Sequence, residues 1–126
     1  MQGKVIKSVK NCYSVLTTEN ELYYCKLKVS DRLQKGRISN PIAVGDFVKF
    51  SINESKKEGI ISEVLPRKNH VIRQSVNLSF KSQILASNID VAFLIVTIKN
   101  PKTSLLFIDR YLVTTNAYKI PTILIF

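Results

Sequence analysis

Two apolar runs in the last third of the chain constrain its fold more than any other feature. Val91–Val96 is continuously apolar, and a second apolar run, Thr122–Phe126, follows Pro121. Such runs are typical of strands in a parallel sheet, which bury both faces. Between them, Ser104 is placed to cap a helix that continues to about Ala117. A strand, a helix and a strand in this order predict a βαβ unit, the start of an α/β domain.

The predicted helix carries its apolar residues at helical spacing, and these are Leu105, Ile108, Leu112 and Val113. One βαβ unit cannot cover both faces of its own sheet. We therefore expect the sequence to be the front part of a longer protein. We also expect the uncovered apolar sheet to favour self-association, because an exposed edge recruits another strand.

The first 66 residues carry a different pattern, in which short strand-like runs alternate with turns. The five runs are Val5–Val9, Tyr13–Thr17, Glu21–Val29, Asp46–Ile52 and Gly59–Val64. A longer, basic connection at 30–41 separates the third run from the fourth. Five short strands with one long connection after the third predict a mainly β architecture, a five-stranded OB-fold barrel, with an SH3-like barrel as the alternative.

Residues 67–83 are mostly polar with single apolar residues, a composition that is typical of a connector. We therefore predict three parts: an OB-fold barrel at 1–72, a linker at 73–83, and the opening of an α/β domain at 84–126.

The charge of the chain is strongly positive and unevenly distributed. The formal net charge is +10, and 15 of the 19 basic residues lie among the first 83. An excess of this size favours polyanionic partners, either nucleic acid or an acidic membrane surface. The concentration of charge on the barrel favours nucleic acid.

Alternation along the third and fourth strands places aromatic and basic residues together on an outward face. Tyr24 is followed by Lys26 and Lys28, and Phe47 is followed by Lys49. Rings that stack on bases, beside ammonium groups that contact phosphates, suit single-stranded RNA. With basic residues from the connections added, the predicted RNA-binding set is Tyr24, Lys26, Lys28, Arg32, Lys35, Arg37, Phe47, Lys49, Arg67, Lys68 and Arg73. The alternative for each is a ring that caps a small core or a solvated charge.

Motifs for catalysis, nucleotide binding and metal binding are absent from the sequence. It contains no GxxxxGK[ST] phosphate loop and no paired-cysteine or HExxH metal spacing, and His70 is its single histidine. Cys12 and Cys25 are expected to be buried free thiols rather than a disulfide. Because no segment resembles a signal peptide or a membrane span, we expect a cytoplasmic location.

Several local motifs, in order along the whole chain, resemble the RsgA/YjeQ family, bacterial GTPases that act on the small ribosomal subunit. The matching segments are Tyr13–Val15, Cys25–Lys28, Val44–Val48, Gly59–Asn69, Ala86–Asp90 and Asp109–Leu112. One departure is visible at Lys28–Arg32, where the family often has a glycine and this chain has none.

The resemblance implies an OB-fold that binds ribosomal RNA, followed by a circularly permuted GTPase domain. It also implies GTP, magnesium and zinc as ligands of the full-length protein, and GTP hydrolysis during late maturation of the small subunit. The guanine-reading motif of the family would follow Phe126, so no nucleotide or zinc residue is assigned in these 126 residues, and the chain alone is expected to be inactive. The rival interpretations are a stand-alone OB-fold RNA-binding module and a protein-interaction barrel attached to an unrelated α/β domain.

Overall fold

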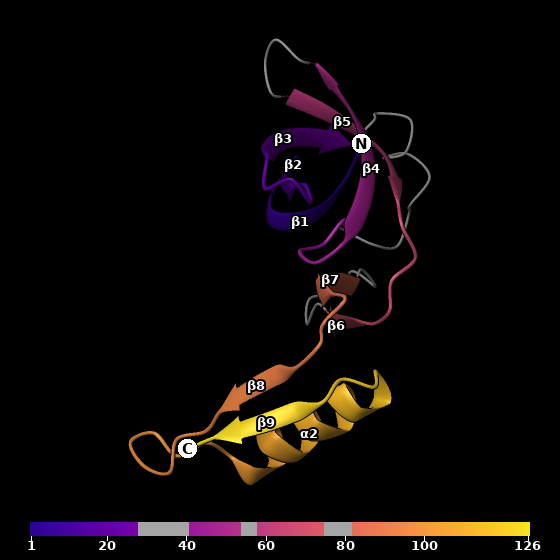
Figure 1. Cartoon of the computed structure of the whole chain (residues 1–126). Coiled ribbons are helices and arrows are strands. Elements are labelled where there is room, and N and C mark those ends of the chain that lie inside the picture. Colours follow the sequence, from indigo (N-terminus) through magenta and orange to yellow (C-terminus); the bar gives the residue numbers. More distant parts are fainter. Residues whose placement is uncertain (28–40, 54–57, 75–81) are drawn as a thin grey trace. The chain divides into compact units, whose positions relative to one another are not determined.

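The computed structural model describes residues 1–27, 41–53, 58–74 and 82–126, which form two compact units, Met1–Asn88 and Ile89–Phe126 (Figure 1). The five strands expected in the first part are present, with ends that differ by a few residues. They are β1 (Gln2–Val9), β2 (Cys12–Leu16), β3 (Leu22–Leu27), β4 (Phe47–Asn53) and β5 (Glu58–Val64).

These five strands close into a barrel in the order β1-β2-β3-β5-β4, with β4 pairing back onto β1. The pairing of β3 with β5 is parallel, and the other pairings are antiparallel. This is the five-stranded Greek-key barrel of the OB-fold, as the sequence pattern predicted.

Inward-facing side chains from all five strands fill the barrel. The buried cluster includes Val5 from β1, Val15 from β2, Cys25 from β3, Phe50 from β4 and Ile61 from β5. Each of the valine, isoleucine and phenylalanine side chains stabilises the fold by roughly 1.5–3 kcal/mol when fully buried. The alternation predicted for the third and fourth strands is confirmed, because Cys25, Leu27, Val48 and Phe50 are buried while Tyr24, Lys26, Phe47 and Lys49 are exposed.

A second, two-stranded sheet follows the barrel within the first unit. It consists of β6 (His70–Gln74) and β7 (Ser82–Ser87), paired antiparallel with an irregularity between Val71 and Ile72. Residues 67–83 were expected to be a connector, and β6 corrects that expectation. The sequences of β6 and β7 are short and carry few apolar residues, so they give only a weak strand pattern. Ile84 of β7 is nevertheless buried. The domain limits predicted from the sequence, with a linker at 73–83, stay a prediction.

The second unit is the βαβ arrangement expected from the two apolar runs. Strand β8 (Ala92–Ile95) and strand β9 (Thr122–Ile125) are parallel, and α2 (Leu105–Ala117) lies between them in sequence, with Ser104 at its N-cap. Figure 1 shows α2 packed along one face of this pair. The side chains on that face include the buried Leu94 and the partly buried Leu124.

Phe93, Ile95, Ile123 and Ile125 are exposed, so only one face of the strands is covered, as expected for a single βαβ unit. The expectation for the helix needs correction. In the helix, Leu105 and Val113 are each 69% exposed, whereas Ile108, Leu112 and Thr115 are turned inward. Leu105 begins the helix, and Val113 lies about 100° around the helix from Leu112, outside the inward stripe. Within the described residues, no helix has the length and apolar character needed to cross a membrane.

Candidate nucleic-acid interface

The outer face of β3 presents an aromatic ring and an ammonium group side by side. Cys25 and Leu27 point into the core, so alternation turns Tyr24 and Lys26 outward. The Tyr24 side chain is 60% exposed, although a ring of this size is usually well covered in a folded domain. Proteins that bind single-stranded nucleic acid combine an exposed aromatic ring with a neighbouring positive charge in this way.

Strand pairing extends this face across β5 to β4 in two neighbouring rows. In the first row, Tyr24 of β3 lies opposite Glu58 of β5, which lies opposite Asn53 of β4. In the second row, Lys26 lies opposite Ile60, which lies opposite Ser51, and Lys26 also pairs with Cys12 of β2. The pairing of β3 with β5 thus brings together side chains of the two strands that are more than thirty residues apart in sequence.

A pocket of about 330 Å³ opens among these rows. Its lining residues are Cys12, Tyr24, Cys25, Lys26, Ser51, Ile52, Asn53, Glu58, Gly59 and Ile60. The volume lies at the lower end of the range for ligand pockets, roughly 300–1,000 Å³. The pocket joins apolar surface to a few polar groups, which suits one small planar ligand group.

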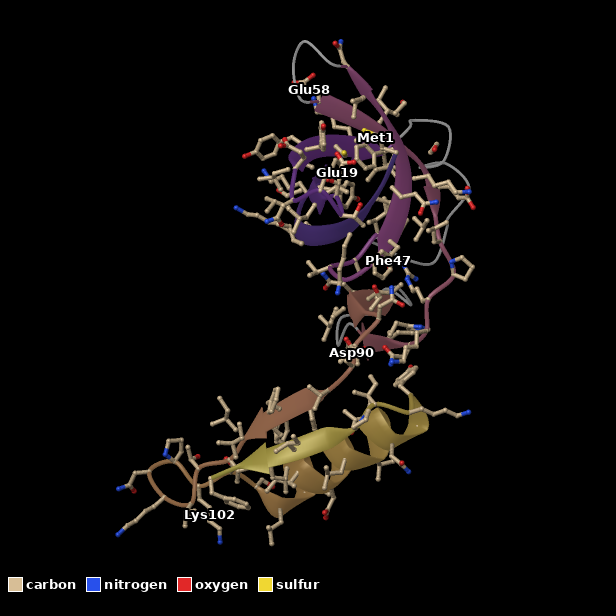
Figure 2. The ribbon with its side chains drawn as sticks, in the orientation of Figure 1. Met1, Glu19, Phe47, Glu58, Asp90 and Lys102 are labelled. Atoms are coloured by element: carbon tan, nitrogen blue, oxygen red, sulfur yellow. The ribbon has the colours of Figure 1, made fainter. Side chains whose placement is uncertain are left out.

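Phe47 lies at the other end of the barrel, and Lys49 lies between it and the second row, two residues before Ser51 on β4. Phe47 is six residues before Asn53 on β4, which corresponds to roughly 20 Å along a strand. Figure 2 shows Phe47 and Glu58 at opposite ends of the barrel. The structure therefore does not gather Tyr24, Lys26, Phe47 and Lys49 into one compact patch.

The side chains of Phe47 and Lys49 already have partners. The Lys4 ammonium lies over the Phe47 ring, 5.6 Å from its centroid. Lys49 Nζ is 2.8 Å from Glu63 Oε2, in an ion pair of two half-exposed side chains. The ion pair with Glu63 leaves Lys49 with less uncompensated charge than the sequence alone indicated.

Arg67 has a structural role that the sequence analysis did not recognise. Its Nε donates to Asp46 Oδ1 at 2.6 Å, and its Nη2 donates to Asp46 Oδ2 at 2.7 Å. Nη2 also donates to the carbonyl of Pro41 at 3.0 Å. A bidentate pair of this kind is geometrically specific, and the Arg67 side chain is only 20% exposed. Its fork is occupied, so we leave Arg67 out of the RNA-binding set.

Asp46 is the centre of the network that holds Arg67. It is fully buried, and it also accepts hydrogen bonds from the backbone N–H of Ala43 at 2.9 Å and from Ser87 Oγ at 2.5 Å. Burial alone would raise the pKa of Asp46, but the hydrogen bonds from Arg67, Ala43 and Ser87 outweigh it and lower that pKa. The carboxylate therefore ties β7 and Arg67 to the turn that precedes β4.

Gly45 in the same turn allows the backbone of β7 to approach the backbone of the turn very closely. Its φ is +97°, and a Cβ at this position would meet the carbonyl oxygen of Ser87 at 2.0 Å. The Gly45 carbonyl accepts from Asn88 Nδ2 at 2.9 Å. The Val44-Gly45-Asp46 motif is thus the attachment point of the β6–β7 sheet to the barrel.

The remaining candidate residues divide into two groups. Lys68 is exposed, and its backbone N–H donates to Asn88 Oδ1 at 2.8 Å, while Arg73 lies in β6. The others, Lys28, Arg32, Lys35 and Arg37, lie outside the described residues.

Sequence reasoning missed several residues around the rows. Glu58, Ile60, Ser51 and Asn53 belong to the pocket only because β5 pairs with both β3 and β4, and a pairing of distant strands is not visible in a local pattern. The exposed Lys4, Lys7 and Lys10 add charge to β1 and its turn. Alternation in Gln2–Val9 could have assigned Lys4 to the outer face.

The two cysteines differ in environment. Cys25 is buried, and burial raises the pKa of its thiol to about 11. Cys12 is exposed, which corrects the expectation that both thiols are buried, and both are free as predicted. Cys12 lies opposite the outward-facing Lys26 in the β2–β3 pairing, so the Cys12 side chain also lies on the outer face. Among the described residues, no group of three or more His, Cys, Asp or Glu side chains could hold a metal ion.

Comparison with known families gives two matches that together cover most of the chain. The RsgA N-terminal domain matches residues 2–61, and the RsgA GTPase matches residues 64–126.

Individual relatives give the same result. The chain is 45% identical to the small ribosomal subunit biogenesis GTPase RsgA of Christiangramia forsetii and 48% identical to that of Phocaeicola vulgatus, over its full length in both cases. It spans only 41% and 40% of the length of these two proteins. It also resembles the crystal structure of YloQ, a circularly permuted GTPase, with a TM-score of 0.67 and 27% identity over 98% of this chain and 39% of that one.

Proposed function

The chain belongs to the RsgA family, and on this premise we propose that it is part of a small ribosomal subunit biogenesis GTPase. The proposal has two components. The barrel binds RNA of the small ribosomal subunit, and the full-length protein hydrolyses GTP during late maturation of that subunit.

One observation carries the RNA-binding component, namely the exposed pair Tyr24 and Lys26 beside the pocket of β3, β5 and β4. The ring offers a stacking platform, and the ammonium offers a phosphate contact. The excess of basic residues among the first 83 supplies long-range attraction to a polyanion. Lys4, Lys7 and Lys10 extend the basic surface along β1.

The GTPase component rests on family membership, because the sequence contains no phosphate loop. GTP and Mg²⁺ are the ligands that this activity requires, and a zinc site completes the proposal for the full-length protein. We assign none of these ligands to a residue of this chain, and we propose that the 126 residues alone are inactive.

Binding of the chain to small-subunit RNA at several salt concentrations tests the RNA-binding component. We expect log affinity to fall linearly with log salt, because each phosphate contact releases counterions. Lys26→Glu should weaken binding and reduce the slope by about 0.7 for a single-stranded contact. Tyr24→Leu should weaken binding roughly 5- to 150-fold with an unchanged slope, since it removes a stack but no charge.

Lys102→Glu is the matched control for charge, because this exposed lysine belongs to the second unit and not to the barrel. It should leave the salt slope of RNA binding unchanged. A folded Lys26→Glu variant that binds RNA as tightly as the parent at every salt concentration would show that the proposed face is wrong. Absence of RNA binding by the parent chain would instead favour a protein-interaction barrel.

A further inference from the structure

The pocket of the barrel contains a carboxylate that a simple phosphate-binding surface would not need. Glu58 begins β5 at the pocket wall, and its side chain is exposed. Figure 2 shows it at the end of the barrel. A carboxylate repels phosphate oxygens and only accepts hydrogen bonds, so at the pocket wall Glu58 suits a ligand group that donates hydrogen bonds.

The neighbours of Glu58 suit the flat face of such a group. Tyr24 lies beside Glu58 across the β3–β5 pairing, and Ile60 follows two residues later on the same outward face. Both side chains are more than half exposed and line the pocket. A ring and a branched aliphatic side chain offer the apolar surface on which a base rests. Lys26, opposite Ile60, places a positive charge where a flanking phosphate would lie.

The chemistry of a carboxylate discriminates among the four RNA bases. An ionised carboxylate only accepts hydrogen bonds, through two oxygens. Guanine offers two adjacent donors on its Watson–Crick edge, N1–H and the N2 amino group. Adenine and cytosine offer one amino group beside an acceptor nitrogen, and uracil offers one N–H between two carbonyl oxygens. Guanine is therefore the base that satisfies both oxygens of Glu58 at once.

We propose that the pocket between β3, β5 and β4 binds one unpaired guanine of the RNA, with Glu58 as the residue that determines this specificity. The inference rests on the proposed RNA-binding function and adds to it a base preference. Tyr24 and Ile60 hold the base, and Lys26 contacts the phosphate beside it.

Short uridine-rich RNA strands with one central guanine, adenine, cytosine or inosine test the proposal against the 126-residue chain. The guanine strand should bind roughly 5- to 150-fold more tightly than the adenine strand, the range for one good bidentate contact. Inosine lacks the N2 amino group and should bind between the two. Glu58→Gln should bring the guanine and adenine affinities close together, because the amide oxygen and amide NH₂ cannot accept two donors.

Glu19→Gln is the control, because it removes the same charge from an exposed residue in the turn between β2 and β3. It should retain the guanine preference. Salt-dependent binding with equal affinity for guanine and adenine would overturn the specificity while leaving the RNA-binding function intact. A guanine preference that persists in Glu58→Gln would overturn the role of Glu58. Failure of the parent chain to bind any strand or small-subunit RNA would overturn both proposals.

Discussion

At the scale of single residues, basic side chains serve two different purposes in this chain. Lys26 is exposed beside the pocket, whereas Arg67 is held by the buried carboxylate of Asp46 through two short hydrogen bonds. A basic residue after the fifth strand could have faced solvent or a buried acid. The deciding partner lies 21 residues earlier in sequence, so the choice depended on tertiary structure.

Asp46→Asn should destabilise the first unit by an amount toward the lower end of about 3–5 kcal/mol, the cost of removing one partner from a buried pair. The pKa of Asp46 is lowered in the folded state. Its contribution to stability is therefore present above the unfolded pKa, about 3.9, and is lost as pH falls through the folded pKa. The difference in unfolding free energy between parent and variant should shrink as pH is lowered from neutral into this range.

Urea unfolding at a series of pH values, followed by circular dichroism, measures this difference. Glu19→Gln is the control and should track the parent throughout, because Glu19 is exposed in a turn. Asp46→Asn stability that runs parallel to the parent at every pH would contradict the assigned role of the carboxylate.

The two cysteines should differ sharply in reactivity. Cys12 is exposed, whereas Cys25 is 1% exposed and burial raises the pKa of its thiol to about 11. Because the thiolate is the reactive form, iodoacetamide at pH 8 should modify Cys12 and spare Cys25 until urea is added. Peptide mass spectrometry reads the two sites separately, and Cys12→Ser should remain unlabelled without denaturant. Equal labelling of both cysteines in the native chain would refute the buried position of Cys25.

At the scale of elements, the sequence was informative wherever a run was long or strictly alternating. The five barrel strands and the helix Leu105–Ala117 follow from such patterns, and so do the outward positions of Tyr24 and Lys26. The strand His70–Gln74 was missed because its run is short and lies among polar residues. The pocket was missed because it depends on the parallel pairing of β3 with β5, which no local pattern encodes.

The uncovered face of β8 and β9 predicts self-association of the chain. Ile95 is 74% exposed, and Phe93, Ile123 and Ile125 surround it with further apolar surface. A second copy of the chain can bury such a surface. Ile95→Lys should raise the dissociation constant of the dimer roughly 10- to 100-fold, the equivalent of one buried aliphatic side chain.

Sedimentation velocity over a range of protein concentrations measures the association. Val9→Lys is the control, because Val9 is an exposed apolar residue of β1. It should associate like the parent. A parent chain that stays monomeric at every concentration would contradict the prediction.

At the scale of the whole molecule, the two units differ in how completely they bury their apolar side chains. The barrel encloses a core drawn from all five strands. The second unit leaves apolar side chains exposed on both its strands and its helix, among them Phe93, Leu106 and Phe107. We therefore expect the first unit to carry most of the stability of the chain, and the RNA-binding tests to report on a folded barrel.

The last prediction is that the chain does not bind GTP. Tight binding of the triphosphate requires a glycine-rich loop at a helix N-terminus, together with ligands for Mg²⁺. The sequence has four glycines, and none belongs to a GxxxxGK[ST] motif. Isothermal titration with GTP and Mg²⁺ should give no saturable heat, and a full-length member of the family in the same buffer should provide the positive control. Micromolar binding by the 126-residue chain would require a nucleotide site outside the known motifs, and the assignment of inactivity would then be wrong.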